Sequence, residues 1–157
     1  MRVGIGHDTH RLVDGRPLIL AGLKIDSPRG LAGHSDADVV LHALTDALLG
    51  AAGLGDIGDA YPDNDPRWQN ADSTLFVRET LARLNQSGWR LVNVDVIIFA
   101  EAPKLGPLKT QMRQSLANLL GVAEAAVNVK AKTGEGVGVI GRGEAISCQA
   151  VVLIDSQ

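Results

Sequence analysis

The sequence predicts an α/β fold in which helices cover one face of a mixed β-sheet. Three observations carry this prediction: the chain has 157 residues, strand-like and helix-like segments are mixed along it, and no internal repeat divides it. A chain of this length suits one domain with a sizeable core. Strands and helices mixed in one domain favour layered packing. We therefore expect residues 1–157 to form a single domain.

The first third of the chain predicts two strands followed by a helix. Strands are expected at about Arg2–Asp8 and Pro17–Ile25, joined by the turn-forming pair Asp14-Gly15. The loop SPRGLAGHS then leads into a strongly apolar segment from about Asp36 to Gly53, which predicts a helix capped by Ser35. A helix this apolar is expected to be largely buried.

The rest of the chain predicts a long loop, two helices and three strands. The stretch GLGDIGDAYPDNDPRW is rich in Gly, Asp and Pro, and loops of that length tend to be functional. Amphipathic helices are expected at about Ser73–Gln86 and Leu108–Leu120. Strands are expected at WRLVNVDVIIFAEA, at about Val127–Lys132 and at about Ala145–Ile154.

Composition and charge argue against several classes of protein. The chain is 45% hydrophobic and 21% charged, which is typical of globular proteins. Its formal net charge of −3 argues against general binding of nucleic acid or anionic membranes, so a polyanionic substrate would need gathered cations or metal ions. The single cysteine, Cys148, excludes an internal disulfide and is expected to be a buried hydrophobe. Without a membrane-spanning or targeting pattern, we expect a cytoplasmic protein.

The opening strand contains GIGHDTH, which is unusually polar for a strand. Side chains alternate between faces in an extended segment, so Asp8 and His10 point one way and His7 and Thr9 the other. An Asp and a His on one face make a natural pair of ligands for a divalent metal. The alternative is a charged strand end that faces water. His7, on the opposite face, is expected to serve packing or hydrogen bonding.

A second polar group lies on the apolar helix. Asp38, His42 and Asp46 are spaced by four, so they form one stripe that faces either solvent or a lined site. Together with Asp8 and His10, His42 would complete a set of three protein ligands with an open position, which is typical of catalytic zinc sites. Asp38 or Asp46 would then orient the His42 imidazole.

Several other polar residues are candidates for contact with a substrate. His34 precedes the helix, where free N–H groups favour an anion such as phosphate. The aspartates of DIGDAYPDNDP either contact a substrate or cap ordinary turns. Alternation places Lys130 and Lys132 on one strand face, with Ala131 opposite, and that face is either directed at a site or solvated.

A series of motifs runs in order from Gly4 to about Glu144: G-x-G-x-D-x-H, H-S-D-A-D-V-x-x-H-A-x-T-D-A-L-L-G-A, G-D-I-G, P-D-x-D-P, N-V-D-V, A-P-K, N-V-K-A-K-T and G-R-G-E. With these motifs the chain resembles the 2-C-methyl-D-erythritol 2,4-cyclodiphosphate synthases of non-mevalonate isoprenoid biosynthesis. The resemblance implies a metal-dependent cyclising phosphorus–oxygen lyase. Its substrate would be 4-diphosphocytidyl-2-C-methyl-D-erythritol 2-phosphate, whose 2-phosphate attacks the β-phosphorus and expels CMP. It also implies an α/β sandwich that forms a homotrimer around packed sheets, with active sites between subunits.

The resemblance assigns roles to individual residues. Asp8, His10 and His42 would bind Zn²⁺, and Glu135 would bind Mg²⁺ or Mn²⁺ between the α- and β-phosphates. His34 and Thr133 would hold phosphates and stabilise the transition state. The erythritol part would lie at Asp56, Gly58 and Asp63, and cytidine at residues 100–106 and 131–133. Within the cytidine segments, the substrate contacts that it implies are Ala100, Pro103, Lys104, Leu105, Gly106, Ala131 and Lys132. Outside them, it implies contacts at Ser35, Ile57, Asp65, Val139 and Arg142.

The resemblance also implies a central cavity on a threefold axis, lined by Arg142 and Glu144. Glu144 is expected on the same face of an extended segment, where it can pair with Arg142 of its own chain or of a neighbouring chain. Such a cavity suits an isoprenoid diphosphate, although Val139 stands where many relatives carry an aromatic residue. Two alternatives are a metal phosphohydrolase of the His-Asp type and a non-catalytic trimeric ligand-binding module.

Overall fold

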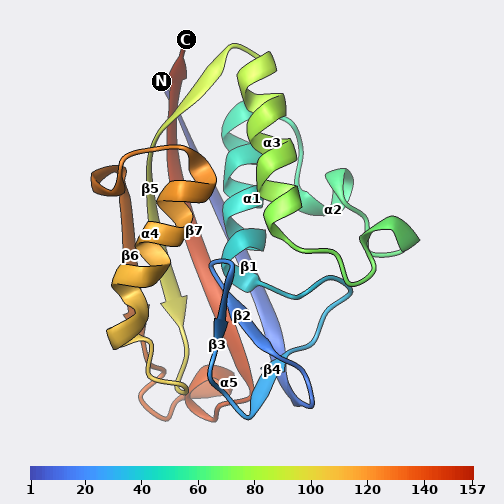
Figure 1. Cartoon of the computed structure of the whole chain (residues 1–157), viewed down its shortest axis with the longest axis vertical. Helices are drawn as coiled ribbons and strands as arrows, with labels where there is room; N and C mark the ends of the chain where they lie inside the picture. The colour runs from blue at the N-terminus through green and yellow to red at the C-terminus, as the bar shows by residue number, and fades with distance from the viewer.

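The computed structural model describes residues 1–157 as a five-stranded mixed sheet with helices on one face (Figure 1). The strand order is β4-β1-β7-β5-β6. β1 pairs with β4 and β7, and β7 with β5, in antiparallel fashion, while β5 and β6 are parallel. The strands are β1 (Arg2–Asp14), β4 (Arg29–Leu31), β5 (Trp89–Phe99), β6 (Val127–Lys132) and β7 (Ala145–Ser156). The predicted fold class is confirmed.

Three helices form the layer over the sheet: α1 (Val39–Ala52), α3 (Thr74–Gln86) and α4 (Lys109–Leu120). α1 and α3 run side by side, and α4 lies over the β5–β6 side (Figure 1). α1 is buried along most of its length, as its composition predicts, and joins the sheet in one apolar cluster. No helix has the length and apolar character needed to span a membrane.

Short elements connect the larger ones, and the loop around α2 projects beyond α1 and α3 (Figure 1). The short elements are the hairpin strands β2 (Leu18–Leu20) and β3 (Leu23–Ile25), the helices α2 (Ile57–Ala60) and α5 (Gly138–Gly141), and the 3₁₀ turns η1 (Pro66–Trp68), η2 (Gly106–Leu108) and η3 (Glu124–Ala126).

Several predicted boundaries were wrong at the N-terminal end of the chain. β1 continues beyond Asp8 because its second half pairs with β4. The strand expected at 17–25 is a hairpin that turns at Ala21-Gly22, both with positive φ. The backbone N–H groups of this turn donate to the buried Asp38 carboxylate at 3.0 and 2.6 Å. An alanine in a tight turn gives no sequence signal, because the distant carboxylate supplies the stabilisation.

The start of α1 also differs from the prediction. Asp38, rather than Ser35, is the N-cap, and it accepts hydrogen bonds from the backbone N–H groups of Val40 and Leu41. The helix ends at Gly53 in a left-handed conformation, as expected. α3 and α4 each begin one residue later than predicted.

Two glycines of β1 allow α1 to approach the sheet unusually closely. A Cβ atom on Gly4 would lie 2.0 Å from the carbonyl oxygen of Ala47, and one on Gly6 would lie 2.0 Å from that of Ala43. No real side chain tolerates such a contact, so glycine is required at both positions. The next inward positions of β1 therefore face His42, the neighbour of Ala43, at short range.

The face of the sheet opposite the helices is uncovered and carries an exposed apolar patch where β1 pairs with β7. Val3 is 66% exposed, Ile5 67% and Val151 42%. His7 lies on this face and hydrogen-bonds Thr9, which agrees with the alternation predicted for β1. Exposed apolar area of this kind marks an interaction surface.

Candidate metal centre and active site

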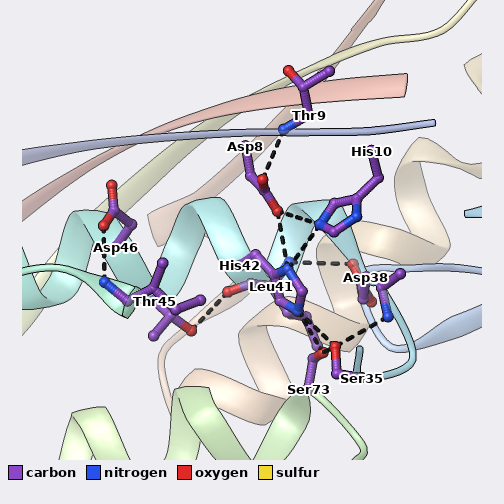
Figure 2. A network of polar contacts seen from close by, with 12 residues as sticks. Asp8, Thr9, His10, Ser35, Asp38, Leu41, His42, Thr45, Asp46 and Ser73 are labelled. Atoms are coloured by element: carbon purple, nitrogen blue, oxygen red, sulfur yellow. Dashed lines mark hydrogen bonds and ion pairs between the residues drawn. The ribbon is translucent and has the colours of Figure 1, made fainter. Parts of the chain in front are cut away.

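Asp8, His10 and His42 converge where β1 faces α1 (Figure 2). The Asp8 Oδ2 atom lies 2.8 Å from His10 Nε2 and 2.9 Å from His42 Nδ1. The two nitrogen atoms are 3.2 Å apart. All three side chains are half-buried, and together they form a group that can hold a metal ion. The convergence predicted from the sequence is thus present within one chain.

The outer nitrogen of each imidazole faces an oxygen atom that can accept its proton. His10 Nδ1 lies 2.5 Å from the carbonyl oxygen of Ala32, which can only accept. His42 Nε2 lies 3.0 Å from the Ser35 hydroxyl and 2.9 Å from the Ser73 hydroxyl. Protons on these outer nitrogens leave a lone pair on each inner nitrogen, directed at the Asp8 carboxylate. Three acceptors at such short range repel one another unless a cation lies between them.

The protonation equilibria of the cluster reflect the same demand for positive charge. Burial alone would raise the pKa of Asp8, but when the two imidazoles carry protons on their inner nitrogens, the hydrogen bonds and charges of His10 and His42 hold it well below its usual range. Burial alone would lower the pKa of His10, but the Asp8 carboxylate raises it above its ordinary value. Two imidazoles and one carboxylate are also a donor set that suits Zn²⁺.

Neither aspartate of the predicted stripe orients His42, so that expectation was wrong. Asp38 is fully buried, and its carboxylate accepts four backbone N–H groups at the β2–β3 turn and the start of α1. Burial raises the pKa of Asp38 to about 6. Asp46 instead accepts from the backbone N–H of Ile57. The serines contact the imidazole because the chain before α1 and the start of α3 both meet His42.

A cavity of about 550 Å³ opens over the cluster. Of the predicted site residues outside the cluster, it is lined by His34, Ser35, Ile57, Gly58 and Asp63. The His34 Nε2 atom lies 3.2 Å from the carbonyl oxygen of Asp65, and its ring borders the cavity. The lining that sequence reasoning missed consists of Gly33, Tyr61, Pro62, Asn64, Trp68 and Phe76.

The missed aromatic residues form one wall of this cavity. The ring centroids of Tyr61 and Phe76 are 4.7 Å apart, and the Trp68 ring centroid lies 5.3 Å from that of Tyr61 and 5.6 Å from that of Phe76. The whole chain has only two Phe, two Trp and one Tyr. Two of these five lie within the loop GLGDIGDAYPDNDPRW, and that concentration was a usable signal.

Asp56 and Asp65 serve local turns and are not among the lining residues. Asp56 caps α2 and accepts from the backbone N–H of Asp59 at 2.9 Å. Asp65 caps η1 and pairs with the Arg67 guanidinium, which holds the pKa of Asp65 below its usual range. The turn-capping interpretation describes both sets of contacts.

A second cavity, of about 140 Å³, lies between the end of β5 and the end of β6. It brings together most of the residues expected around cytidine: Ala100, Lys104, Leu105, Gly106, Ala131, Lys132 and Thr133, with Glu101 and Lys109 in addition. Beside it, the Thr133 hydroxyl donates to Glu135 Oε1 at 2.6 Å. No residue lines both this cavity and the one at the metal cluster.

Lys130 and the GRGE segment lie outside both cavities. Lys130 pairs with Asp95 on the uncovered sheet face. Arg142 Nε donates to Glu144 Oε1 at 2.7 Å, so the two side chains do pair. The segment is not extended as predicted, because Arg142 ends α5 in a helical conformation and Gly143 has a φ of 65°. Val139 nearby is 47% exposed.

Comparison with known proteins agrees with these features. A family model described as the YgbB family matches residues 1–155. The chain belongs to this family. It is 54% identical over 156 residues to a Bordetella avium protein named 2-C-methyl-D-erythritol 2,4-cyclodiphosphate synthase, covering 99% of this chain and 96% of that one. The family expected from the motifs is therefore confirmed, and with it the class of cyclising lyase in isoprenoid biosynthesis.

Solved structures give the same result. A 2C-methyl-D-erythritol-2,4-cyclodiphosphate synthase in a form bound to CDP has a TM-score of 0.91 at 43% identity, covering 98% of this chain and all of that one. A Plasmodium falciparum IspF in complex with CDP has a TM-score of 0.87 at 31% identity, covering 99% of this chain and 96% of that one. Both comparison proteins thus bind a cytidine nucleotide.

Proposed function

We propose that this enzyme converts 4-diphosphocytidyl-2-C-methyl-D-erythritol 2-phosphate to 2-C-methyl-D-erythritol 2,4-cyclodiphosphate and CMP at the Asp8, His10 and His42 cluster. The observation that carries the proposal is the convergence of three ligand atoms at the base of a 550 Å³ cavity. Asp8, His10 and His42 would hold Zn²⁺. When bound, Zn²⁺ supplies a Lewis acid for the phosphate oxygens of the substrate.

The chain's own residues would mainly fold the substrate into position. Because the nucleophile and the electrophile belong to one molecule, orientation lowers the barrier strongly, and effective molarities reach on the order of 10⁵ M or more. Ile57, Gly58 and Asp63 border the cavity and would hold the erythritol part. His34, which also borders the cavity, would donate to a phosphate oxygen. A phosphate dianion is already a nucleophile, so no general base is required.

We assign the second metal to Glu135. Its Oε1 atom accepts from Thr133, and no protein donor contacts its Oε2 atom. Mg²⁺ and Mn²⁺ prefer carboxylate and phosphate oxygens, and Mg²⁺ is usually bound through one or two carboxylates and the substrate's phosphates. We therefore propose that Glu135 holds Mg²⁺ or Mn²⁺ only together with the substrate diphosphate, and that Thr133 contacts a phosphate.

We propose a homotrimer with active sites between subunits. The residues around the 140 Å³ cavity, which would bind cytidine, are separate from the metal cluster within one chain. Assembly through the uncovered sheet face would bring one subunit's nucleotide cavity to its neighbour's metal centre. Sedimentation velocity would detect the trimer, and a monomer with full activity would contradict it.

We further propose that the trimer's centre binds an isoprenoid diphosphate weakly, with Arg142 contacting the diphosphate and Val139 the tail. The Arg142–Glu144 pair reduces the positive field available to that ligand, which supports weak binding. We place the enzyme in the cytoplasm, in line with its single cysteine, which suits a reducing compartment.

Phosphorus NMR of the purified protein with the cytidylyl substrate and divalent metal tests the reaction. The expected products are a cyclic diphosphate and CMP, with no oxygen from ¹⁸O-labelled water in either. Labelled phosphate would instead identify a hydrolase, and absence of turnover with tight substrate binding would identify a binding module.

A further inference from the structure

A chain of three polar groups leads away from the metal cluster through His42 (Figure 2 shows its first link). The His42 Nε2 atom lies 2.9 Å from the Ser73 hydroxyl. That hydroxyl contacts Asp36 Oδ1 at 2.5 Å, and the Ser73 backbone N–H donates to Asp36 Oδ2 at 3.1 Å. Ser73 is fully buried at the N-cap of α3, and Asp36 precedes α1. Three segments of the chain are thus tied together behind the histidine.

The direction of the protons in this chain is fixed by what each group can donate. An ionised carboxylate can only accept, so the Ser73 hydroxyl proton points to Asp36. The hydroxyl oxygen then faces His42 as an acceptor, and the imidazole must donate from Nε2. In a neutral imidazole this leaves the lone pair on Nδ1, the atom that lies 2.9 Å from Asp8 Oδ2.

Ser35 also contacts His42 Nε2, at 3.0 Å, but it does not fix the tautomer in the same way. Its hydroxyl accepts from the backbone N–H of Ala37, and its own proton remains free to point in either direction. Of the two serines, only Ser73 has the direction of its hydroxyl proton fixed by a carboxylate. His10 reaches the same result by a simpler route, because its Nδ1 atom faces a backbone carbonyl.

We infer that Asp36 and Ser73 are positioning residues that hold the His42 imidazole in the Nε2–H tautomer, with the Nδ1 lone pair directed at the metal position. The inference rests on the metal site proposed above and deepens it. Outer partners of this kind orient ligand histidines and strengthen metal binding. Here the carboxylate acts through an intervening hydroxyl, so its charge is kept out of the cavity that receives the anionic substrate.

Zinc affinity of the metal-free protein, measured by competition with a chromophoric chelator at constant pH, tests this role. Ser73→Ala and Asp36→Asn are expected to bind Zn²⁺ roughly 10- to 100-fold more weakly than the wild type. Ser73→Thr keeps the hydroxyl and should restore most of the affinity. Asp46→Asn is the matched control, because this aspartate lies one helical turn from His42 but contacts only the Ile57 backbone.

A second measurement separates positioning from general loss of structure. Imidazole ¹⁵N shifts of the metal-free proteins, read where His42 is neutral, should show the Nε2–H tautomer in the wild type and a mixture in Ser73→Ala. Equal zinc affinity and an unchanged His42 tautomer in Ser73→Ala and Asp36→Asn would overturn the positioning role of Asp36 and Ser73 but not the metal site. A wild-type protein that binds no zinc would overturn both the metal site and the positioning role of Asp36 and Ser73.

Discussion

The two halves of the candidate site are built in different ways. Around the metal cluster, polar side chains are tied to distant parts of the chain: Asp38 to the β2–β3 turn, Asp36 to the start of α3, and Arg16 to the loop before α1. Around Thr133 and Arg142, the side-chain pairs are local, Thr133 with Glu135 and Arg142 with Glu144, and the one long-range side-chain contact runs from the Gly134 backbone N–H to Glu101. The first half is preorganised by the fold, whereas the second has exposed groups that are free to meet a substrate or a neighbouring subunit.

The largest expected effect follows from breaking the preorganised half at its centre. His42→Ala removes one of three ligands from a site on the surface of α1, so tight zinc binding and CMP release should both be lost while the protein still folds. Elemental analysis and a CMP assay measure the two losses. Full zinc occupancy in this variant would reject the ligand assignment.

The close contact of β1 and α1 can be broken without touching a polar group. Gly6→Ala places a methyl group against the Ala43 carbonyl, which should cost about 1–3 kcal/mol of unfolding free energy and weaken zinc binding. Gly50→Ala is the control, because its new Cβ meets nothing closer than 3.9 Å. Urea unfolding of both variants gives the comparison, and equal stability would show that the contact is not required.

Arg16 tests whether the loop that carries His34 must be held in place. Its guanidinium donates to the carbonyl oxygens of Gly33 and Ser35 at 2.9 and 2.8 Å, on either side of His34. Arg16→Met should lower kcat about tenfold, the effect of about 1.4 kcal/mol, while zinc affinity changes little. Arg90→Met, at an exposed ion pair, is the control. An unchanged kcat would mean that the loop holds its shape without the arginine.

A substitution in the second half should change the metal dependence of turnover rather than the stability of the fold. Glu135→Gln should keep zinc and the wild-type unfolding temperature, because this side chain is exposed. It should need far more Mg²⁺ or Mn²⁺ for turnover, since the amide is a weaker ligand than the carboxylate. A metal-dependence curve identical to that of the wild type would remove Glu135 from the reaction.

The smallest effect is expected at the proposed trimer centre. Calorimetry with geranyl diphosphate should detect weak binding to the wild type and none to Arg142→Ala. Val139→Phe should bind more tightly, because a ring fills more of the cavity than valine does. Equal binding by the wild type and Arg142→Ala would assign the arginine to packing alone.

The sequence predicts the metal cluster because its signals are local. Strand alternation places Asp8 and His10 on one face, and apolar composition buries the helix that carries His42. Spacing alone misassigned Asp38, since α1 begins one residue after it and the free backbone N–H groups there outcompete the imidazole for its carboxylate. The Ser73 and Asp36 contacts join residues that are 37 apart in sequence and meet only when α3 docks.

Other features depend on backbone conformations that the sequence only partly reveals. The Arg142–Glu144 pair was predicted correctly from a wrong conformation, because the positive φ of Gly143 also brings the two side chains together. The aromatic wall was missed because Tyr61 and Trp68 come from a loop without a periodic pattern. Local rules therefore find the ligands, and tertiary packing decides what surrounds them.

Anomalous diffraction at the zinc edge, on crystals of the zinc-loaded protein, tests the central claim most directly. We predict one peak per chain, with Asp8 Oδ2, His10 Nε2 and His42 Nδ1 at about 2.0–2.2 Å and the Ser73 hydroxyl still facing His42 Nε2. A peak outside this cluster, or a His42 ring turned so that Nε2 binds the metal, would contradict the account.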